Sequence, residues 1–353
     1  MQELITQFSH TIQEAARSLS PLHIKGSGSK LFYGCPTQGK ILDVTPYTGI
    51  VNYEPTELVL TARAGTPLAE IEAALASKRQ MLAFEPPHFG EGATLGGCVA
   101  AGLSGPRRAY AGAVRDFVLG VRMIDGKGED LKFGGQVMKN VAGYDVSRLM
   151  AGSLGTLGVL LEVSLKVLPV PAEELTLRFE LAQQNALDMM NRYAALPLSL
   201  SASCYHEGVM TLRLSGAASA IRSAQAKLGG EIVSDAEKFW LGLREQQHDF
   251  FKRRQNLWRL SLPSTSQALT LPGHQLIEWG GAIRWLLSDE PAAIIRQSVS
   301  ALGGQAILFK SPDPMLNTPF HPLSSQLMAI HQRLKHSFDP HHIFNPGRMY
   351  PEL

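Results

Sequence analysis

The residues best suited to chemistry in this chain lie in a glycine-rich stretch at positions 84–105, FEPPHFGEGATLGGCVAAGLSG. Six glycines fall between Gly90 and Gly105, and no charged residue follows Glu91. Main chain without Cβ atoms lets an anionic group or a flat ring approach the backbone amides closely. A flexible linker is the alternative, but linkers are Ser, Gly and Pro mixtures without Leu, Cys and Val among the glycines. The stretch therefore predicts a loop that cradles a ligand.

A second glycine-rich segment, GSGSK at positions 26–30, lies between two short predicted strands at 22–25 and 40–44. Consecutive N–H groups in such a turn can form a concave nest for a pyrophosphate. Read alone, the segment is an ordinary Gly/Ser turn. It is neither a GxGxxG that opens a helix nor a P-loop, because Lys30 follows the wrong glycine spacing. Together with the first stretch, it predicts a second loop that contacts phosphate.

A third glycine-dense element covers positions 139–159, KNVAGYDVSRL followed by GSLGTLGV. Gly155 and Gly158 would allow a flat ring to approach the backbone of the strand that follows. A tight turn from helix to strand explains the same residues, and both interpretations stay open here.

Regular elements on either side of these loops must position them. Leu4, Phe8, Ile12 and Leu19 recur at helical spacing and predict an amphipathic surface helix rather than a signal peptide. A strand at 58–64 leads to a helix with Thr66 as N-cap and Pro67 at its first position. The apolar stripe of that helix consists of Leu68, Ile71 and Leu75.

The remaining strands of the N-terminal half are marked by turn signals and alternation. Asp125-Gly126-Lys127-Gly128 predicts a hairpin between strands at 117–124 and 130–133. Alternating apolar residues at 157–168 predict a strand that ends at Pro169. The sequence Pro169-Val170-Pro171 is the best candidate for a domain boundary. An α+β pattern follows from 173 to about 310, and then a helix at 323–336.

Composition narrows the class of protein. A length of 353 residues suggests two domains, and a net charge of +2 gives no reason to expect nucleic acid as a partner. The scattered cysteines Cys35, Cys98 and Cys204 provide no disulfide framework and cannot supply four thiolates to an iron–sulfur cluster. They indicate a reducing compartment. The longest uncharged run, at 260–277, contains two prolines, so no transmembrane segment is expected.

Four motifs in order resemble the FAD-binding domain of the vanillyl-alcohol oxidase/p-cresol methylhydroxylase (PCMH) superfamily. They are GSGS after a strand, EPP with GATLGG and AAGLSG, KNVAGYDVSRLMAGSLGTLGVLLEVSLKVLP, and DPHHIFNPGRMY near the C-terminus. The resemblance covers about residues 20–170 and the last fifteen. Within the superfamily the chain is similar to the glycolate oxidase and D-2-hydroxyacid dehydrogenase branch. Its shortness and its GPRRAYAGAVRDFVLG segment most resemble the FAD-binding E subunits of bacterial glycolate oxidases.

The resemblance implies an α+β fold: a two-subdomain PCMH-type FAD-binding domain at 1–171, a smaller α/β cap domain at 172–310, and a C-terminal segment at 311–353 that packs back on the FAD domain. It also implies the cofactor-binding residues. Pyrophosphate and ribose would contact the first loop, a second phosphate and the flavin would contact the second, the strand at 158–159 would pack on the flavin or adenine, and the NPG motif would return to the flavin pocket. In that order these residues are Gly26, Ser27, Gly28, Ser29 and Lys30; Pro86, Thr94, Leu95, Gly96, Gly97, Gly102 and Gly105; Gly158 and Val159; and Asn345.

Departures from the family pattern matter as well. Covalent members carry a histidine in or near the first phosphate loop, where this chain has Ser27 and Ser29, with His23 on the preceding strand. Noncovalent FAD is therefore expected. Substrate-oxidising relatives carry an HxGDGN-like motif in the cap, and none occurs between residues 173 and 310. No catalytic residue is assigned.

Several other residues carry open or rejected interpretations. Arg107, Arg108 and Arg115 are either surface residues or cofactor contacts, and the cluster Trp279–Trp285 lines a pocket, forms an interface or packs in the core. His206, His248 and His274 are isolated in sequence. The spacing of His331 and His336 does not place them on one helical face, so no metal site is expected there.

The implied function is that of an FAD-dependent oxidoreductase subunit. The resemblance implies a glycolate oxidase (glycolate dehydrogenase) complex with a catalytic FAD subunit and an iron–sulfur subunit, which oxidises the 2-hydroxyacid glycolate to glyoxylate. The alternatives are a flavin-binding subunit that is non-catalytic or only relays electrons, and a stand-alone FAD-dependent 2-hydroxyacid oxidoreductase. The expected location is the cytoplasm, or the inner membrane periphery through the complex.

Overall fold

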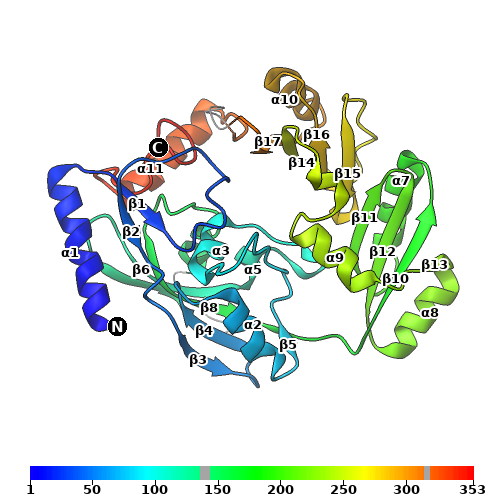
Figure 1. Cartoon of the computed structure of the whole chain (residues 1–353), viewed down its shortest axis with the longest axis horizontal. Coiled ribbons are helices and arrows are strands. Elements are labelled where there is room, and N and C mark those ends of the chain that lie inside the picture. The colour runs from blue at the N-terminus through cyan, green and yellow to red at the C-terminus, as the bar shows by residue number, and fades with distance from the viewer. Residues whose placement is uncertain (136–143, 314–318) are drawn as a thin grey trace. The chain divides into compact units, whose positions relative to one another are not determined.

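The computed structural model of the chain describes residues 1–135, 144–313 and 319–353 (Figure 1). Positions 139–143, the start of the third glycine-dense element, lie outside the described residues. The chain forms two compact units. The first contains residues 1–103, 113–169 and 322–353, and the second contains residues 104–112 and 170–321.

The first unit contains an antiparallel sheet whose strands follow the order β3-β4-β8-β6-β7. The strands are β3 (Ile50–Glu54), β4 (Val59–Arg63), β6 (Val118–Ile124), β7 (Asp130–Gly134) and β8 (Val159–Lys166). The predicted hairpin is confirmed, because β6 pairs with β7 across the Asp125–Gly128 turn. The alternation predicted for β8 is also confirmed, since Val159, Leu161, Val163 and Leu165 are fully buried. Burial of alternate side chains on one face sets the register of this central strand.

A parallel strand pair, β1 (Leu22–Lys25) and β2 (Lys40–Asp43), packs against the first helix, α1 (Gln2–Ser18). Ile5, Phe8 and Ile12 of α1 share one core cluster with Leu22 and Phe344. The predicted amphipathic helix is thus confirmed. The prediction was wrong for Leu19, the last residue of the expected apolar face. Leu19 adopts a left-handed conformation after the helix and is exposed.

Helix α2 (Leu68–Ala76) buries the predicted stripe of Leu68, Ile71 and Leu75. The predicted cap is wrong. Pro67 is the N-cap residue, and the hydroxyl of Thr66 instead accepts a hydrogen bond from the N–H of Gly49 at 2.9 Å. A long-range contact therefore replaces the local cap. No helix or strand was predicted within the glycine-rich stretch at 84–105. Part of it forms a short helix, α3 (Leu95–Ala101), with Thr94 as its N-cap.

The C-terminal segment belongs to the first unit. Helix α11 (Ser325–Phe338) overlaps the predicted helix at 323–336, and the chain then returns to β1. The N–H of Leu22 donates to the carbonyl of Ile343 at 2.7 Å, and the N–H of Asn345 donates to the carbonyl of Leu22 at 3.0 Å. Smaller elements complete this unit: α5 (Val114–Phe117), α6 (Tyr144–Leu149), and the paired strands β5 (Gln80–Met81) and β9 (Leu168–Pro169).

The second unit is built on an antiparallel sheet with the strand order β13-β10-β12-β11-β15-β16-β14-β17. The strands are β10 (Glu173–Glu180), β11 (Leu200–His206), β12 (Val209–Gly216), β13 (Glu231–Ile232), β14 (Leu257–Ser261), β15 (His274–Glu278), β16 (Ile283–Leu287) and β17 (Gln305–Lys310). The helical elements are α4 (Arg108–Ala111), α7 (Gln183–Ala194), α8 (Ala218–Leu228), α9 (Ala236–Arg244), α10 (Ala292–Ser300) and the short 3-10 turns η1 (Asp249–Lys252) and η2 (Trp279–Gly281). Apolar side chains from α7, α8 and α10 pack on the sheet in three clusters.

Within the described residues, no helix is both long enough and apolar enough to cross a membrane.

Candidate cofactor-binding site

Two adjoining cavities in the first unit bring the predicted glycine loops together. The first is lined by the whole Gly26–Lys30 loop, one side of α3, and residues of the C-terminal segment. The second is lined by Ala64, directly after β4, and by Gly158 and Leu160 at the start of β8. The cavities share six residues: Ile24, Gly26, Gly97, Ala100, Leu154 and Asn345. They therefore form one elongated site, which suits an extended ligand.

The Gly26–Lys30 loop rests directly on the N-terminal end of α3. A Cβ atom on Gly26 would lie 2.5 Å from the hydroxyl oxygen of Thr94, so only glycine allows this approach. Gly28 has a φ of +84°, which side-chain-bearing residues rarely adopt. Thr94 in turn accepts a hydrogen bond from the N–H of Gly97 at 3.3 Å. The two predicted phosphate loops thus form one packed structure.

Two adjacent glycines of α3 have different neighbours. A Cβ on Gly96 would lie 2.8 Å from the Cβ of Ala64 in the chain after β4, so this glycine permits close helix packing. A Cβ on Gly97 would meet only the Thr94 hydroxyl, at 3.1 Å. Gly97 lines both cavities. Its missing side chain therefore leaves room in the site rather than in the core.

The first cavity is strongly cationic. Lys25, Lys30 and Arg348 line it, and no Asp or Glu is among its lining residues. His23 lines it as well, and its pKa is lowered by burial and further by the charges of Arg348 and Lys25. A positive local potential disfavours protonation of the imidazole. The same potential favours an anionic ligand.

Lys30 connects the first loop to the segment before α3. Its ammonium donates to the carbonyl of His88 at 3.2 Å and lies 5.6 Å from the ring centroid of Phe89. His88 also contacts Glu72 of α2 through its Nε2 atom, at 3.2 Å. Pro86, from the same segment, is buried but lines neither cavity.

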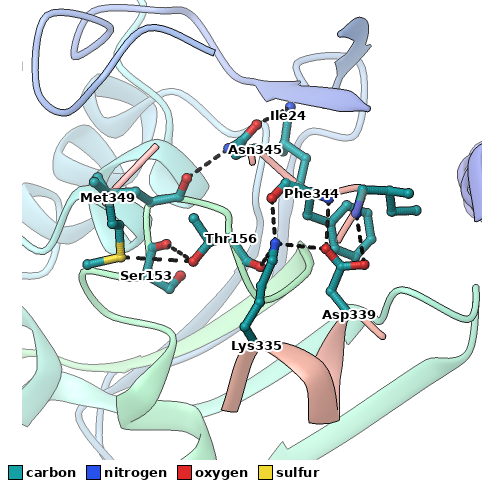
Figure 2. A network of polar contacts seen from close by, with 10 residues as sticks. Ile24, Ser153, Thr156, Lys335, Asp339, Phe344, Asn345 and Met349 are labelled. Carbon is teal, nitrogen blue, oxygen red and sulfur yellow. Dashed lines mark hydrogen bonds and ion pairs between the residues drawn. The ribbon is translucent and has the colours of Figure 1, made fainter. Parts of the chain in front are cut away.

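Asn345 clamps the site from the C-terminal side. Its side-chain oxygen accepts from the N–H of Ile24 at 2.9 Å, and its amide nitrogen donates to the carbonyl of Leu154 at 2.8 Å (Figure 2). The residue has a φ of +40°, and only 4% of it is exposed. Gly155 makes room for the clamp, because a Cβ there would lie 2.7 Å from the Asn345 amide nitrogen. Asn345 thereby joins β1 to the turn before β8, along both cavities.

A buried ammonium group holds this C-terminal segment in place, and sequence reasoning missed it. Lys335 is 1% exposed, and its ammonium donates to Asp339 at 2.8 Å and to the carbonyls of Thr156 and Phe344 at 2.8 and 2.7 Å (Figure 2). Asp339 accepts in addition from the N–H groups of Ile343 and Phe344. Burial lowers the pKa of Lys335, while Asp339 opposes that shift. The sequence signal for this contact was a Lys four residues before an Asp, close to the end of the predicted helix.

Other predicted residues line neither cavity. Leu95 and Val159 are fully buried in the core. Gly102 ends α3 with a φ of +67°, and a Cβ there would lie 2.7 Å from the Cα of Gly152. Gly105 belongs to the second unit, where its carbonyl accepts from the indole N–H of Trp279 at 3.1 Å. By contrast, Gly158 lines the second cavity.

The three arginines whose roles the sequence left open lie in different environments. Arg107 is buried in the second unit and pairs with Glu174, and it also donates to Ser215 at 3.1 Å. Arg108 lies over the ring of Trp279, 4.5 Å from its centroid. Arg115 is exposed, 3.8 Å from Asp116. None of the three is among the residues that line the two cavities.

The aromatic and histidine residues of the second unit pack within it. Trp285 donates its indole N–H to buried Glu278 at 2.7 Å, and both Trp279 and Trp285 are buried. His206 and His248, isolated in sequence, lie with their ring centroids 5.2 Å apart. Burial lowers the pKa of both imidazoles. Tyr205 donates its hydroxyl to the carbonyl of Leu181 at 3.3 Å.

The site in the first unit fits FAD. Gly97 leaves room in the site, and the cationic lining complements the two negative charges of a pyrophosphate diester. The adjoining cavities provide length for a dinucleotide. Cys98, beside Gly97, is fully buried with its pKa raised to about 12 by burial, so its thiol is inert.

Comparison with known proteins agrees with this geometry. A family model described as an FAD binding domain matches residues 4–134. The glycolate oxidase subunit GlcD of Bacillus subtilis (strain 168) is 32% identical over 159 residues, which is 44% of this chain and 34% of that protein. A solved alkyldihydroxyacetonephosphate synthase superposes with a TM-score of 0.64 at 14% identity, covering 97% of this chain and 75% of that chain. This likeness shows the fold, and the predicted α+β PCMH-type fold and the FAD cofactor are confirmed.

The glycolate oxidase subunit GlcE of Escherichia coli (strain K12) is 52% identical over 342 residues. The match covers 97% of this chain and 96% of that protein. Because the similarity spans nearly the whole of both chains, this protein belongs to the GlcE family of FAD-binding oxidoreductase subunits.

Proposed function

We propose that this chain is the FAD-holding subunit of a glycolate oxidase complex that converts glycolate to glyoxylate. The oxidation removes two electrons and two protons from the CH–OH group of glycolate. In this proposal a second, catalytic FAD subunit and an iron–sulfur subunit complete the complex and carry the electrons away. The observation that carries the proposal is the full-length similarity to a glycolate oxidase subunit, together with a cationic, glycine-lined site for FAD.

The chain's own residues would bind and orient the cofactor, whose flavin ring supplies the redox chemistry when bound. The Gly26–Lys30 loop would hold the pyrophosphate, with Gly97 leaving room for it. Gly158 and Leu160 would border the far end of the ligand, and Asn345 would keep the two walls of the site at a fixed distance. We assign the FAD-binding domain at 1–171, the cap at 172–310 and the C-terminal segment at 311–353, as expected from the sequence. The second compact unit differs from that cap, because it includes residues 104–112 and extends from 170 to 321.

A second candidate is that the chain holds FAD without contacting substrate. The cap has no HxGDGN-like motif. The side chains that would replace it as a base are packed instead: His206 lies against His248 and Phe250, and its Nε2 atom lies 3.6 Å from the carboxylate of Glu207. Tyr205 is committed to a backbone carbonyl. These contacts favour an electron-relaying or structural role within the complex over a stand-alone oxidase.

The location of the protein would depend on the complex that it joins. We propose that the protein acts in the cytoplasm, and that its partners place it at the inner membrane if the complex is membrane-associated.

A deletion and complementation experiment tests the proposal. Cells that lack this chain should lose glycolate-dependent dye reduction in extracts, and the wild-type chain should restore it. A Gly97→Val chain should fail to restore activity, while an exposed-site control, Arg115→Gln, should restore it fully. Unchanged glycolate oxidation in extracts of the deletion strain would refute the proposed function.

A further inference from the structure

Arg348, one of the cations that line the first cavity, has its guanidinium held by backbone carbonyl groups. Only 7% of the residue is exposed. Its guanidinium donates to the carbonyls of Cys35 and Tyr33, both at 2.7 Å, and of Leu31 at 3.0 Å. In the backbone, the N–H of Cys35 donates to the carbonyl of Arg348 at 2.9 Å. Arg348 therefore holds the segment that directly follows the Gly26–Lys30 loop.

The charge of Arg348 has no counter-ion among the described residues. All its hydrogen-bond acceptors are backbone carbonyls, and it forms no ion pair with a carboxylate there. Burial lowers its pKa, as expected for a cation removed from water. A buried charge that is hydrogen-bonded but not neutralised is unfavourable unless a ligand provides the opposite charge. Arg348 lines the cationic cavity, where such a ligand would bind.

We propose that Arg348 is a positioning residue for FAD, which both fixes the phosphate loop through its carbonyl contacts and supplies the buried counter-charge of the pyrophosphate. Lys25 and Lys30 also line the cavity, but both are only half-buried, so water and salt screen their charges more than that of Arg348. The planar guanidinium is already fixed by several carbonyls, so little side-chain entropy is lost when the ligand binds. Burial lowers the pKa of His23, and the nearby charges of Arg348 and Lys25 lower it further, so the positive potential of Arg348 reaches into the cavity. The inference rests on FAD binding, and not on the oxidation of glycolate.

The test compares Arg348→Gln and Arg348→Lys with Arg63→Gln, using apoprotein titrated with FAD and separately with ADP. Arg63 is a matched control, because it also donates to a backbone carbonyl in this unit, that of Thr48 at 3.0 Å, and lines neither cavity. Arg348→Gln removes the buried charge proposed to face the pyrophosphate, so it should weaken FAD binding about 10- to 100-fold. ADP carries a pyrophosphate group without the flavin and should also lose affinity. Arg348→Lys should recover most of both losses, and Arg63→Gln should bind like wild type.

Three results would overturn the proposal: Arg348→Gln binding FAD as tightly as wild type, ADP binding unaffected while FAD binding falls, or Arg348→Lys as weak as Arg348→Gln. A purely structural role would lower the melting temperature without this rescue by lysine. If Arg348→Gln does not fold, Arg348→His replaces it. The FAD affinity of Arg348→His relative to wild type should rise as the pH falls below about 6.5, where an imidazole gains its charge. If the ratio of the two affinities does not change with pH, that result counts against the proposal. Glycolate turnover enters none of these measurements, so they stand or fall separately from the proposed function.

Discussion

At the scale of single residues, Gly96 and Gly97 show how neighbouring glycines serve different purposes. Gly97→Val should abolish FAD binding and leave the fold intact, because the added methyl groups enter the cavity rather than the core. Gly96→Ala should instead destabilise the first unit by about 1–3 kcal/mol, since its Cβ meets the chain at Ala64. Gly28→Val should also abolish binding, through strain at a φ of +84°. FAD titration and thermal unfolding of each variant separate these effects.

All four tryptophans of the chain lie in the second unit, so their fluorescence reports its folding in each variant. An unchanged tryptophan unfolding curve beside lost FAD binding is the expected pattern for Gly97→Val. Near wild-type FAD affinity in Gly97→Val or Gly28→Val would show that the corresponding loop had been assigned incorrectly.

The attachment of the flavin also depends on one residue. We expect noncovalent FAD, because the phosphate loop carries Ser27 and Ser29 where covalent relatives carry a histidine. Acid precipitation should therefore release free FAD into the supernatant. His23 lines the same cavity and is the residue to substitute should the flavin remain with the pellet. Loss of retained flavin in His23→Ala would then identify the link and contradict the expectation.

At the scale of elements, the contact between α11 and the turn before β8 depends on Lys335. Lys335→Met should destabilise the first unit by about 3–5 kcal/mol, because Asp339 is left as a buried carboxylate without its cation. FAD binding should weaken at the same time, since Thr156 and Phe344 lose their common donor beside Asn345. Flavin release during urea unfolding measures the effect. Arg333→Met, on the exposed face of the same helix, is the control and should behave like wild type.

The ring contact between His206 of β11 and His248, directly before η1, predicts a pH effect in the second unit. Burial lowers the pKa of His206 and His248 below the unfolded value of about 6.5. As the pH falls through 6.5, the unfolded chain takes up protons before the folded chain does, so stability falls with acidification. His206→Phe keeps a ring against Phe250 and should flatten this dependence. Melting curves by tryptophan fluorescence between pH 7.5 and 5 would show it, and an equally steep curve in the variant would exclude His206 as its source.

At the scale of the whole molecule, we expect the chain to need partner subunits for turnover. Three cysteines cannot ligate a cluster that would carry electrons away from the flavin, and the cap has no identified base. The purified chain should therefore contain FAD and show little reduction of it by glycolate. Addition of the purified partner subunits should restore rapid glycolate-dependent dye reduction. Robust oxidation by the chain alone would contradict this, and His206→Phe and Tyr205→Phe would then show which residue acts as the base.

Short-range patterns made much of the fold predictable. Helical spacing gave α1 and α2, strict alternation gave β8, and a two-glycine turn gave the β6–β7 hairpin, because these depend on neighbours in sequence. The ligand-binding loops were predicted for a different reason. Glycines that tolerate close approach of a ligand are visible in residue type, while FAD as the ligand followed from the resemblance to the FAD-binding family.

The tertiary structure alone decided which distant residues meet. It placed Thr66 against Gly49 rather than on its helix, put Gly105 and Arg107 in the second unit, and brought His206 beside His248. It also gave Asn345, Lys335 and Arg348 their partners some 180 to 320 positions away. Such contacts depend on how strands and helices pack, and no local propensity encodes them. The amino-acid sequence therefore determined the cofactor, through its family motifs, and the glycine loops proposed to hold it. The packing of the C-terminal segment determined the buried charges of Lys335 and Arg348.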